Sequence, residues 1–186
     1  SEFKTSLNSV PSGGFLTDRD KDKKPILDVR ELGIDFGGLT AVDGFNLMIG
    51  RNEITGLIGP NGAGKSTTMN ILTGCLSSTS GRVIVQGIDV LADPLGAKRL
   101  IGYLPEQPPL YFDMTVAEYL KFAAELKKIP KNERETQIEQ VMDLTGITAM
   151  ANRLIKNLSK GYKQRVGLAQ AILGYPEIII LDEPTA

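Results

Sequence analysis

Apolar and polar positions alternate in the first third of the chain, which predicts β-strands. Alternation over 26–32 and 45–49 is typical of strands with one buried and one exposed face. The next apolar run, 54–58, is nearly continuous and predicts a buried strand of a parallel sheet. Shorter strands are expected over 82–86 and 101–104. The pattern therefore predicts an antiparallel sheet followed by a parallel one.

Helical spacing of apolar residues dominates the rest of the chain. Helices are predicted over 64–72, 115–128, 132–145 and 159–174. Thr115 and Glu118 have the spacing of a capping box, in which two free amides at a helix start are satisfied. A last buried strand over 177–182 ends in carboxylates. Strands and helices in this order, with the helices clustered in the middle, predict an α/β sheet that carries a helical lobe.

Composition narrows the class of protein. The 186 residues are 41% apolar, and 21 Lys and Arg against 22 Asp and Glu leave a net charge of −1. A protein that binds nucleic acid through phosphate contacts usually carries a basic surplus, so no nucleic-acid partner is expected. The one cysteine, Cys75, excludes an intrachain disulfide and is expected to be a small buried residue. Because the chain has no histidine, Ser-His-Asp and Cys2His2 sites are also excluded.

A glycine-rich segment carries the most specific chemistry. Residues 59–66 read Gly-Pro-Asn-Gly-Ala-Gly-Lys-Ser, which is the P-loop pattern, between a predicted strand and a predicted helix. Glycines allow backbone amides to converge on phosphate oxygens, and the helix N-terminus adds a partial positive charge. Lys65 is expected to reach the outer phosphates and the Ser66 hydroxyl to ligate Mg2+. The predicted nucleotide-binding residues here are Gly59, Pro60, Asn61, Gly62, Ala63, Gly64, Lys65, Ser66 and Thr67.

Two carboxylates, Asp182 and Glu183, end the last predicted strand. In open α/β sheets, ligands bind at this C-terminal edge. Asp182 is therefore a candidate magnesium ligand acting through water, and Glu183 a candidate to orient or deprotonate the attacking water. Taken alone, Asp-Glu-Pro-Thr is more typical of a polar turn after a strand. Beside the phosphate motif, the catalytic interpretation is favoured.

A third motif points to one family. Residues 158–165, Leu-Ser-Lys-Gly-Tyr-Lys-Gln-Arg, resemble the signature motif of ABC-type ATPases, and 59–67 and 179–185 resemble that family's Walker A and Walker B motifs. The resemblance covers 26–186 and is nearest to ATP-binding subunits of bacterial ABC-2-type exporters. It implies a P-loop NTPase (RecA-like) core with an N-terminal antiparallel β-subdomain and an inserted α-helical lobe. The expected divisions are 1–25, a flexible leader or expression scar; 26–111, the nucleotide-binding core; 112–158, the helical lobe; and 159–186, the signature helix and Walker B strand.

The resemblance also assigns roles across a dimer. It implies that Ser159 and Gly161 contact the γ-phosphate of ATP bound to an opposite subunit, so that two chains close head-to-tail over two nucleotides. An ordinary helix cap is the alternative for Ser159. Two positions depart from the family: Lys160 stands where Gly is usual, and Tyr162 where Gln is usual.

Three further positions are less specific. The family's Q-loop glutamine aligns with Glu106, and Gln107 follows one residue later, so both are catalytic candidates. Phe36 stands where the family stacks an aromatic ring on adenine, and a core phenylalanine is an equally good interpretation. The apolar segment 108–112 is a candidate docking surface for a membrane subunit, with internal packing as the even alternative.

The function implied is that of an ATPase subunit that binds Mg-ATP and couples its hydrolysis to transport. Its partners would be a membrane-spanning subunit, which holds it at the cytoplasmic face of the cell membrane, and an identical or different second nucleotide-binding subunit. The alternatives are a soluble ABC-type ATPase acting on ribosomes or DNA, and a P-loop GTPase or kinase. Because the family continues past 182–186 to a γ-phosphate-contacting histidine, a chain truncated there, with the C-terminal part missing, is expected to hydrolyse ATP poorly.

Overall fold

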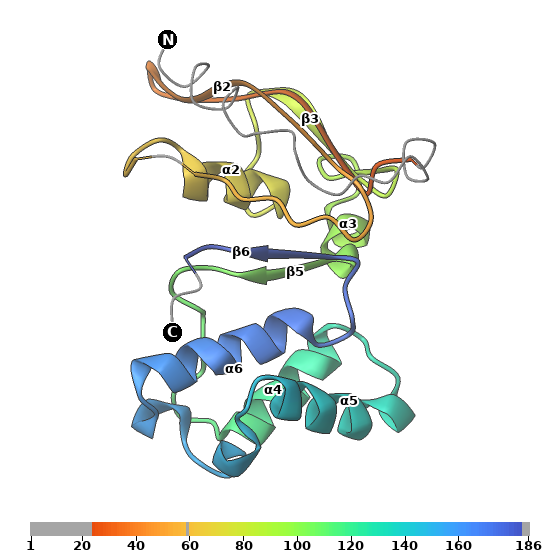
Figure 1. Ribbon diagram of the computed structural model, residues 1–186, viewed down its shortest axis with the longest axis vertical. Helices are drawn as coiled ribbons and strands as arrows, with labels where there is room; N and C mark the ends of the chain where they lie inside the picture. Colours follow the sequence, from red (N-terminus) through yellow and green to blue (C-terminus); the bar gives the residue numbers. More distant parts are fainter. Residues whose placement is uncertain (1–23, 59, 184–186) are drawn as a thin grey trace. The chain divides into compact units, whose positions relative to one another are not determined.

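The computed structural model describes residues 24–58 and 60–183, and it divides into two compact units, Ser1–Ala97 and Lys98–Ala186 (Figure 1). Each unit is treated by itself below. The expected leader, 1–25, lies almost entirely outside the described residues, and so does Gly59 of the phosphate motif.

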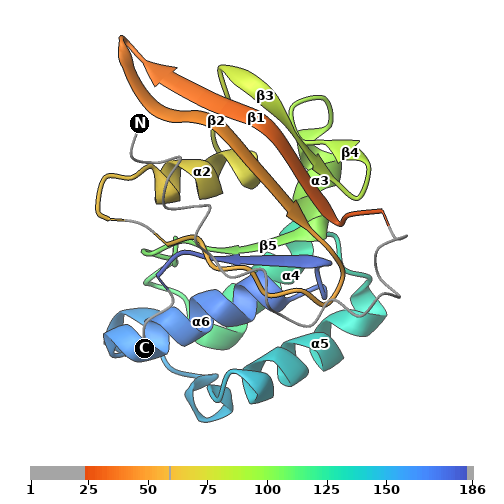
Figure 2. The ribbon, with the colours of Figure 1, turned by 45° about the horizontal axis from the view of Figure 1, so that its top comes forward.

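The first unit is built on a four-stranded antiparallel sheet in the order β2-β1-β3-β4 (Figure 2). Its strands are β1 (Leu27–Phe36), β2 (Leu39–Ile49), β3 (Ser80–Val85) and β4 (Ile88–Asp89). The strands predicted over 26–32, 45–49 and 82–86 are confirmed, while β4 is an addition. Alternate residues of the sheet are buried and form the core of the unit: Leu27, Val29, Leu32, Ile34, Val42, Phe45, Val83 and Val85.

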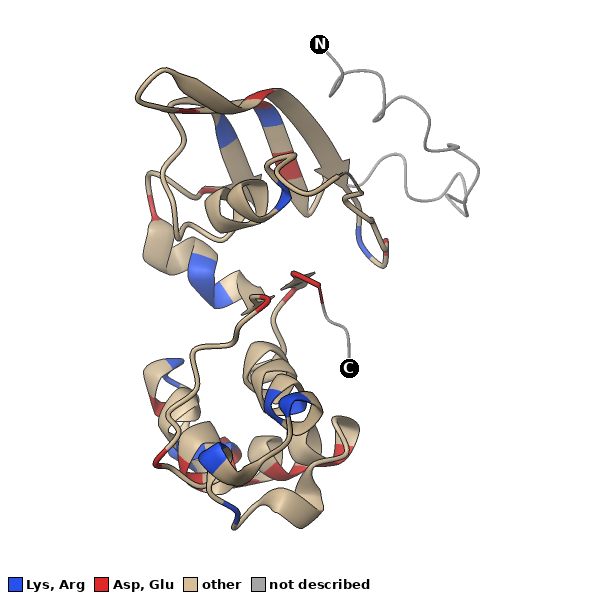
Figure 3. Cartoon of the chain, turned by 90° about the vertical axis from the view of Figure 1, so that its left-hand side faces the viewer, with Lys and Arg blue, Asp and Glu red and all other residues tan. Residues whose placement is uncertain are grey.

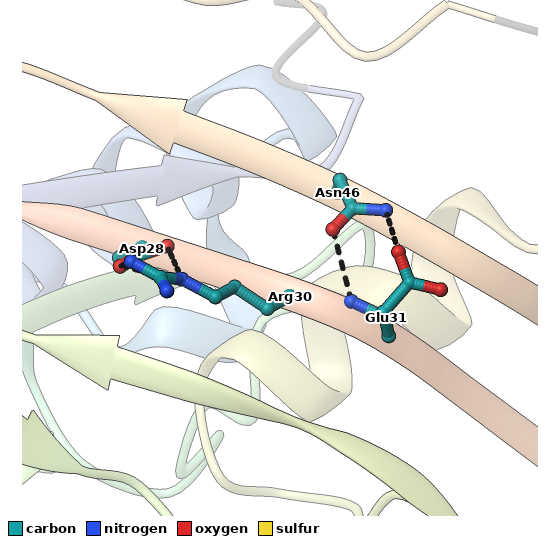
Figure 4. Close-up of polar contacts among 4 residues, drawn as sticks. All are labelled: Asp28, Arg30, Glu31 and Asn46. Atoms are coloured by element: carbon teal, nitrogen blue, oxygen red, sulfur yellow. Dashed lines mark hydrogen bonds and ion pairs between the residues drawn. The ribbon is translucent and has the colours of Figure 1, made fainter.

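Strand β1 is irregular at Glu31, whose φ of 47° is unusual for a residue with a side chain. Asn46 of β2 holds this kink, since its side chain accepts from the Glu31 amide at 3.0 Å and donates to the Glu31 carboxylate at 2.7 Å (Figure 4). On the β3 side, a Cβ added at Gly81 would lie 2.4 Å from the Glu31 carbonyl oxygen, so only glycine fits there. Arg30 makes an ion pair with Asp28 at 2.7 Å, which lowers the pKa of that carboxyl.

The apolar segment 54–58 is not a strand, contrary to the prediction. Ile54 is 100% exposed and Ile58 is 84% exposed, and neither sheet of the described residues includes the segment. A strand needs neighbours that take up its backbone N–H and C=O groups, and the described part of this unit provides none beside 54–58. The apolar content of 54–58 was therefore not enough to predict a strand.

Helix α2 (Lys65–Leu72) forms where the sequence predicted a helix and buries Thr68, Ile71 and Leu72. The chain turns away at Gly74, which has a φ of 67°. Cys75 follows this turn and is exposed, so its expected burial is wrong. The reason is that α2 has already ended at Leu72, and its C-cap Thr73 is the last buried residue before the turn.

The second unit pairs β5 (Ile101–Leu104) with β6 (Ile178–Leu181) in a parallel two-stranded sheet. Helix α6 (Lys160–Ile172) lies between these strands and the helices α4 (Val116–Leu126) and α5 (Lys131–Leu144) (Figures 1 and 2). Short 3-10 turns, η2 (Thr148–Met150) and η3 (Ile155–Asn157), connect α5 to α6, and α3 (Pro94–Leu100) leads into β5. The core of the unit lies among the three long helices and includes Val116, Leu120, Ala124, Val141, Ile147, Ile155, Val166 and Leu173.

Helix boundaries in this unit follow the local signals. The capping box is confirmed: Thr115 Oγ1 accepts from the Glu118 amide at 3.3 Å, and the Glu118 carboxylate accepts from the Thr115 amide at 2.8 Å. Strand β6 was expected to be buried, but Ile179 is 46% exposed and Leu181 is 36% exposed. The two-stranded sheet explains this, because α6 covers one of its faces.

Among residues 24–58 and 60–183, no helix has the length and apolar character needed to span a membrane.

Candidate nucleotide-binding site

The phosphate motif forms an open loop ahead of α2. Gly62 and Gly64 have φ values of 81° and 78°, in the region that side chains disfavour. A Cβ at Gly64 would lie 2.5 Å from the Ala41 carbonyl oxygen of β2, so space also requires glycine there. Lys65 Nζ donates to the Pro60 carbonyl at 2.9 Å, which draws the two ends of the loop together.

The N-terminus of α2 is suited to an anion. Gly64 provides no side-chain cap, and the first turn contains no acidic residue. The positive end of α2 is therefore not neutralised by a carboxylate of its own first turn. Ser66 is exposed and Thr67 half-buried in this turn. The described loop, 60–67, thus fits a group with several negatively charged oxygens, as the sequence predicted for a phosphate.

In the second unit, the acidic candidates meet at one edge of the parallel sheet. Leu104 and Leu181 are paired at the ends of β5 and β6, and the Asp182 amide donates to the Leu104 carbonyl at 2.9 Å. Glu106 and Gln107 follow the first strand, and Asp182 and Glu183 follow the second. We call these four residues the acid edge; acidic positions at the strand ends are red in Figure 3.

The two acids of the Walker B stretch differ in burial. Asp182 is only 4% exposed, whereas Glu183 is exposed and has a φ of 46°. A carboxylate as buried as Asp182 is costly unless donors or a cation compensate for its charge. A magnesium ion fits that requirement, and the exposed Glu183 is accessible to water.

Helix α6 reaches the acid edge through a residue that the sequence analysis missed. Gln164 is 8% exposed, and its Nε2 donates to the Glu106 carbonyl at 3.4 Å. Gly167, one turn further, lies so close that an added Cβ would be 2.7 Å from both Leu104 and Pro108 side chains. The signal for Gln164 was its spacing from Gly167 and Ala171, which are also buried and lie on the same face of α6.

Ser159 caps the start of α6, as both interpretations of the sequence expect. Ser159 is the N-cap, and its Oγ accepts from the Tyr162 amide at 3.3 Å. Gly161 has open space where a side chain would begin, and the first turn contains no acidic residue. Lys160 is exposed beside it. The cap is therefore present, and the helix end remains accessible to an anion.

The remaining candidates are partly exposed aromatic residues. Phe36 ends β1 opposite Leu39 and is 49% exposed, so it is not a core residue. Tyr111 is 53% exposed and packs edge-on against Phe122, with ring centroids 5.4 Å apart. Phe112 is 52% exposed, and the Lys163 ammonium lies over its ring, 5.2 Å from the ring centroid. The segment 108–112 thus combines internal packing with an exposed apolar surface.

Residues 42–186 match the family described as "ABC transporter". The chain is 39% identical over 161 residues to the uncharacterized ABC transporter ATP-binding protein YxlF of Bacillus subtilis, an alignment covering 87% of this chain and 53% of that protein. It is 35% identical over 161 residues to the probable multidrug ABC transporter ATP-binding protein YbhF of Escherichia coli, covering 87% and 28% respectively. It is also 40% identical over 145 residues to ABC transporter A family member 1 of Dictyostelium discoideum, covering 78% and 16%. The chain therefore spans about half of the Bacillus relative and less of the other two.

Solved structures agree with this family. The ATP binding subunit of an ABC transporter superposes with a TM-score of 0.79 at 30% identity, covering 86% of this chain and 66% of that one. CbiO1 from Clostridium perfringens, described as part of the ABC transporter complex cbiONQ, gives a TM-score of 0.77 at 31% identity, covering 88% and 67%.

Fold and site thus define a P-loop nucleotide-binding protein of the mixed α/β class with an N-terminal antiparallel sheet, as predicted. More particularly, the chain belongs to the ABC transporter ATP-binding family, whose members bind and hydrolyse ATP.

Proposed function

We propose that the protein to which this chain belongs binds Mg-ATP, hydrolyses it as a head-to-tail dimer and couples hydrolysis to transport by a membrane-spanning subunit. The observation that carries the proposal is the start of α2, where two left-handed glycines precede a helix end with no cap and no acid. An anion with several oxygens is the ligand that such a site favours.

Each residue of the loop has a task in this proposal. Lys65 pairs with the outer phosphates, giving up its contact with the Pro60 carbonyl. Backbone N–H groups of 62–66 donate hydrogen bonds to the phosphate oxygens. Ser66 and Asp182 would hold Mg2+, Asp182 through water. When bound, Mg2+ neutralises part of the charge that develops on the phosphates.

Glu183 is the proposed group that orients or deprotonates the attacking water, with Glu106 and Gln107 near it at the acid edge. Its exposure and its place directly after the buried Asp182 support this role. Phe36 would stack on adenine, for which its exposure at the end of β1 is suitable.

The proposed second subunit supplies Ser159 and Gly161 to the γ-phosphate of the opposite nucleotide, and the open end of α6 supports this assignment. The exposed parts of Tyr111 and Phe112 support docking of a membrane-spanning partner at 108–112. CbiO1, a solved relative, is described as part of a transporter complex. The proposed location is therefore the cytoplasmic face of a membrane, through that partner.

The test is nucleotide binding by the full-length protein. Lys65→Ala removes charge-assisted contacts worth about 1.5–3 kcal/mol, so ATP affinity should fall by roughly 10- to 150-fold. Lys98→Ala, an exposed lysine of α3, serves as the matched control and should bind like wild type. Wild-type affinity in Lys65→Ala would overturn the assignment of the loop.

A second variant separates binding from chemistry. Glu183→Gln keeps the shape of the side chain but removes the base, so ATP should still bind while hydrolysis slows by about 10²–10⁴-fold. Hydrolysis of Mg-ATP at the wild-type rate by Glu183→Gln would exclude Glu183 as the base.

A further inference from the structure

Lys127 makes an unusual contact with the end of another helix. It is the C-cap of α4, and its ammonium donates to the carbonyls of Gln170 at 2.6 Å, Ala171 at 3.2 Å and Leu173 at 2.6 Å. These carbonyls belong to the last turn of α6 and its exit, where intrahelical donors run out. Ala171 and Leu173 are essentially buried, so water does not replace those contacts.

The same exit also packs closely against the parallel sheet. A Cβ added at Gly102 of β5 would lie 2.2 Å from the Ala171 carbonyl oxygen and 2.8 Å from Pro176. The Ala171 carbonyl therefore has the Lys127 ammonium as a donor and the β5 backbone as a close neighbour. Its position leaves little freedom for the segment that follows.

That segment leads directly to the acid edge. Residues 173–177 connect α6 to β6, and Asp182 and Glu183 directly follow β6. The other end of α6 is the start of the signature segment, and its middle holds the Glu106 carbonyl through Gln164. A shift of the exit would therefore displace β6 along or away from β5, and with it the two carboxylates.

We infer that Lys127 is a positioning residue for hydrolysis, which acts through the exit of α6 to hold Asp182 and Glu183 in place. The inference rests on the proposed function of those carboxylates. It requires a donor that reaches three carbonyls at once, which a protonated lysine provides. Burial lowers the pKa of Lys127 to about 8, so the assays are run at pH 7, where the ammonium form predominates.

The experiment compares Lys127→Met, Lys127→Arg and the neighbouring exposed control Lys128→Met in the full-length protein. Three quantities are measured at pH 7: bound ATP per chain, kcat per bound ATP, and the Mg2+ concentration that gives half-maximal hydrolysis. For Lys127→Met we expect an unchanged number of ATP molecules bound per chain and a several-fold higher Mg2+ requirement. We also expect a roughly tenfold lower kcat per bound ATP, because misplacement of a catalytic group by about 1 Å costs up to 10²-fold in rate. Lys127→Arg should recover at least half of the wild-type kcat, and Lys128→Met should match wild type.

A merely structural role would lower the number of molecules that bind ATP but not kcat per bound ATP or the Mg2+ requirement. Wild-type values of both in Lys127→Met overturn the inference. If Lys127→Met does not fold, the same measurements are made on Lys127→Gln, whose shorter neutral amide cannot reach three carbonyls. A wild-type kcat per bound ATP and a wild-type Mg2+ requirement in Lys127→Gln would also overturn the inference. If the wild-type protein does not hydrolyse Mg-ATP, the proposed function fails and the inference fails with it.

Discussion

Gly102 offers a sharp test of how tightly α6 packs on the parallel sheet. Its backbone conformation is ordinary, so space alone excludes a side chain. In Gly102→Ala the new Cβ would lie 2.2 Å from the Ala171 carbonyl oxygen, 2.8 Å from Pro176 Cγ and 3.0 Å from the Ala171 carbonyl carbon. Carbon and oxygen atoms normally approach to about 3.3 Å, so the backbone must move by about 1 Å.

The cost follows from what blocks the methyl group. Overpacking of a core costs about 1–3 kcal/mol, and a backbone atom that Lys127 also holds cannot rotate away as a side chain could. We therefore expect Gly102→Ala to lower the free energy of unfolding of the second unit by about 3 kcal/mol. For a unit of about 90 residues, 98–186, that corresponds to a fall in Tm of roughly 12–24 °C.

The assay can follow the second unit alone. The chain has no tryptophan, and all five tyrosines lie between 103 and 175, so tyrosine fluorescence or near-ultraviolet circular dichroism in urea reports that unit. Gly161→Ala is the control, because nothing lies within 4 Å of its Cβ position and alanine should stabilise α6 by about 0.5–1 kcal/mol. Unfolding of Gly102→Ala within about 0.5 kcal/mol of wild type would refute this account of the packing.

Three other outcomes are expected. Thr115→Ala removes the N-cap of α4 and should lower the same unfolding free energy by about 1 kcal/mol, against no loss in the exposed control Lys121→Ala. The hydrogen bond from the Thr115 amide, and to a smaller extent that from the Thr115 hydroxyl, lowers the pKa of Glu118. The capping contribution to stability is therefore present above the pKa of Glu118 in the unfolded state, and it is lost as the pH falls through the pKa in the folded state. Urea titrations from pH 6 to 3 should show this loss in wild type but not in Glu118→Gln. In Gly64→Ala the new Cβ would lie 2.5 Å from the Ala41 carbonyl oxygen, at a residue whose φ of 78° disfavours a side chain. The substitution should therefore abolish ATP binding in equilibrium titrations, and near-normal affinity would contradict the loop geometry.

Helix limits and turns were predictable because their causes are local. Thr115 and Glu118 are three residues apart, and the buried face of α5, Ile138, Val141 and Met142, needs only helical spacing. The glycines of the phosphate loop likewise carry their conformational preference with them. None of these features depends on a distant segment.

Features that depend on partners far along the chain were not predictable. The segment 54–58 has the composition of a buried strand but no paired neighbour in its own unit. Gln164 and Lys127 meet their partners across 58 and 43 or more residues. Helical spacing can place Gln164 on a buried face, but it cannot identify the partner of either residue. The kink at Glu31 likewise exists through Asn46, fifteen residues away.

By itself, then, the order of residues determined which chemistry this protein carries: a glycine loop for phosphate, two acids after a strand and a capped helix beside them. Short-range hydrogen bonds and backbone preferences suffice for that, since they act within a few residues. Only the tertiary structure decided that Asp182 is buried while Glu183 is exposed, that Glu106 and Asp182 share one edge, and that Lys127 closes the end of α6. Those outcomes require chain segments to meet in space, because burial and long-range hydrogen bonding are properties of the packed unit rather than of any single stretch.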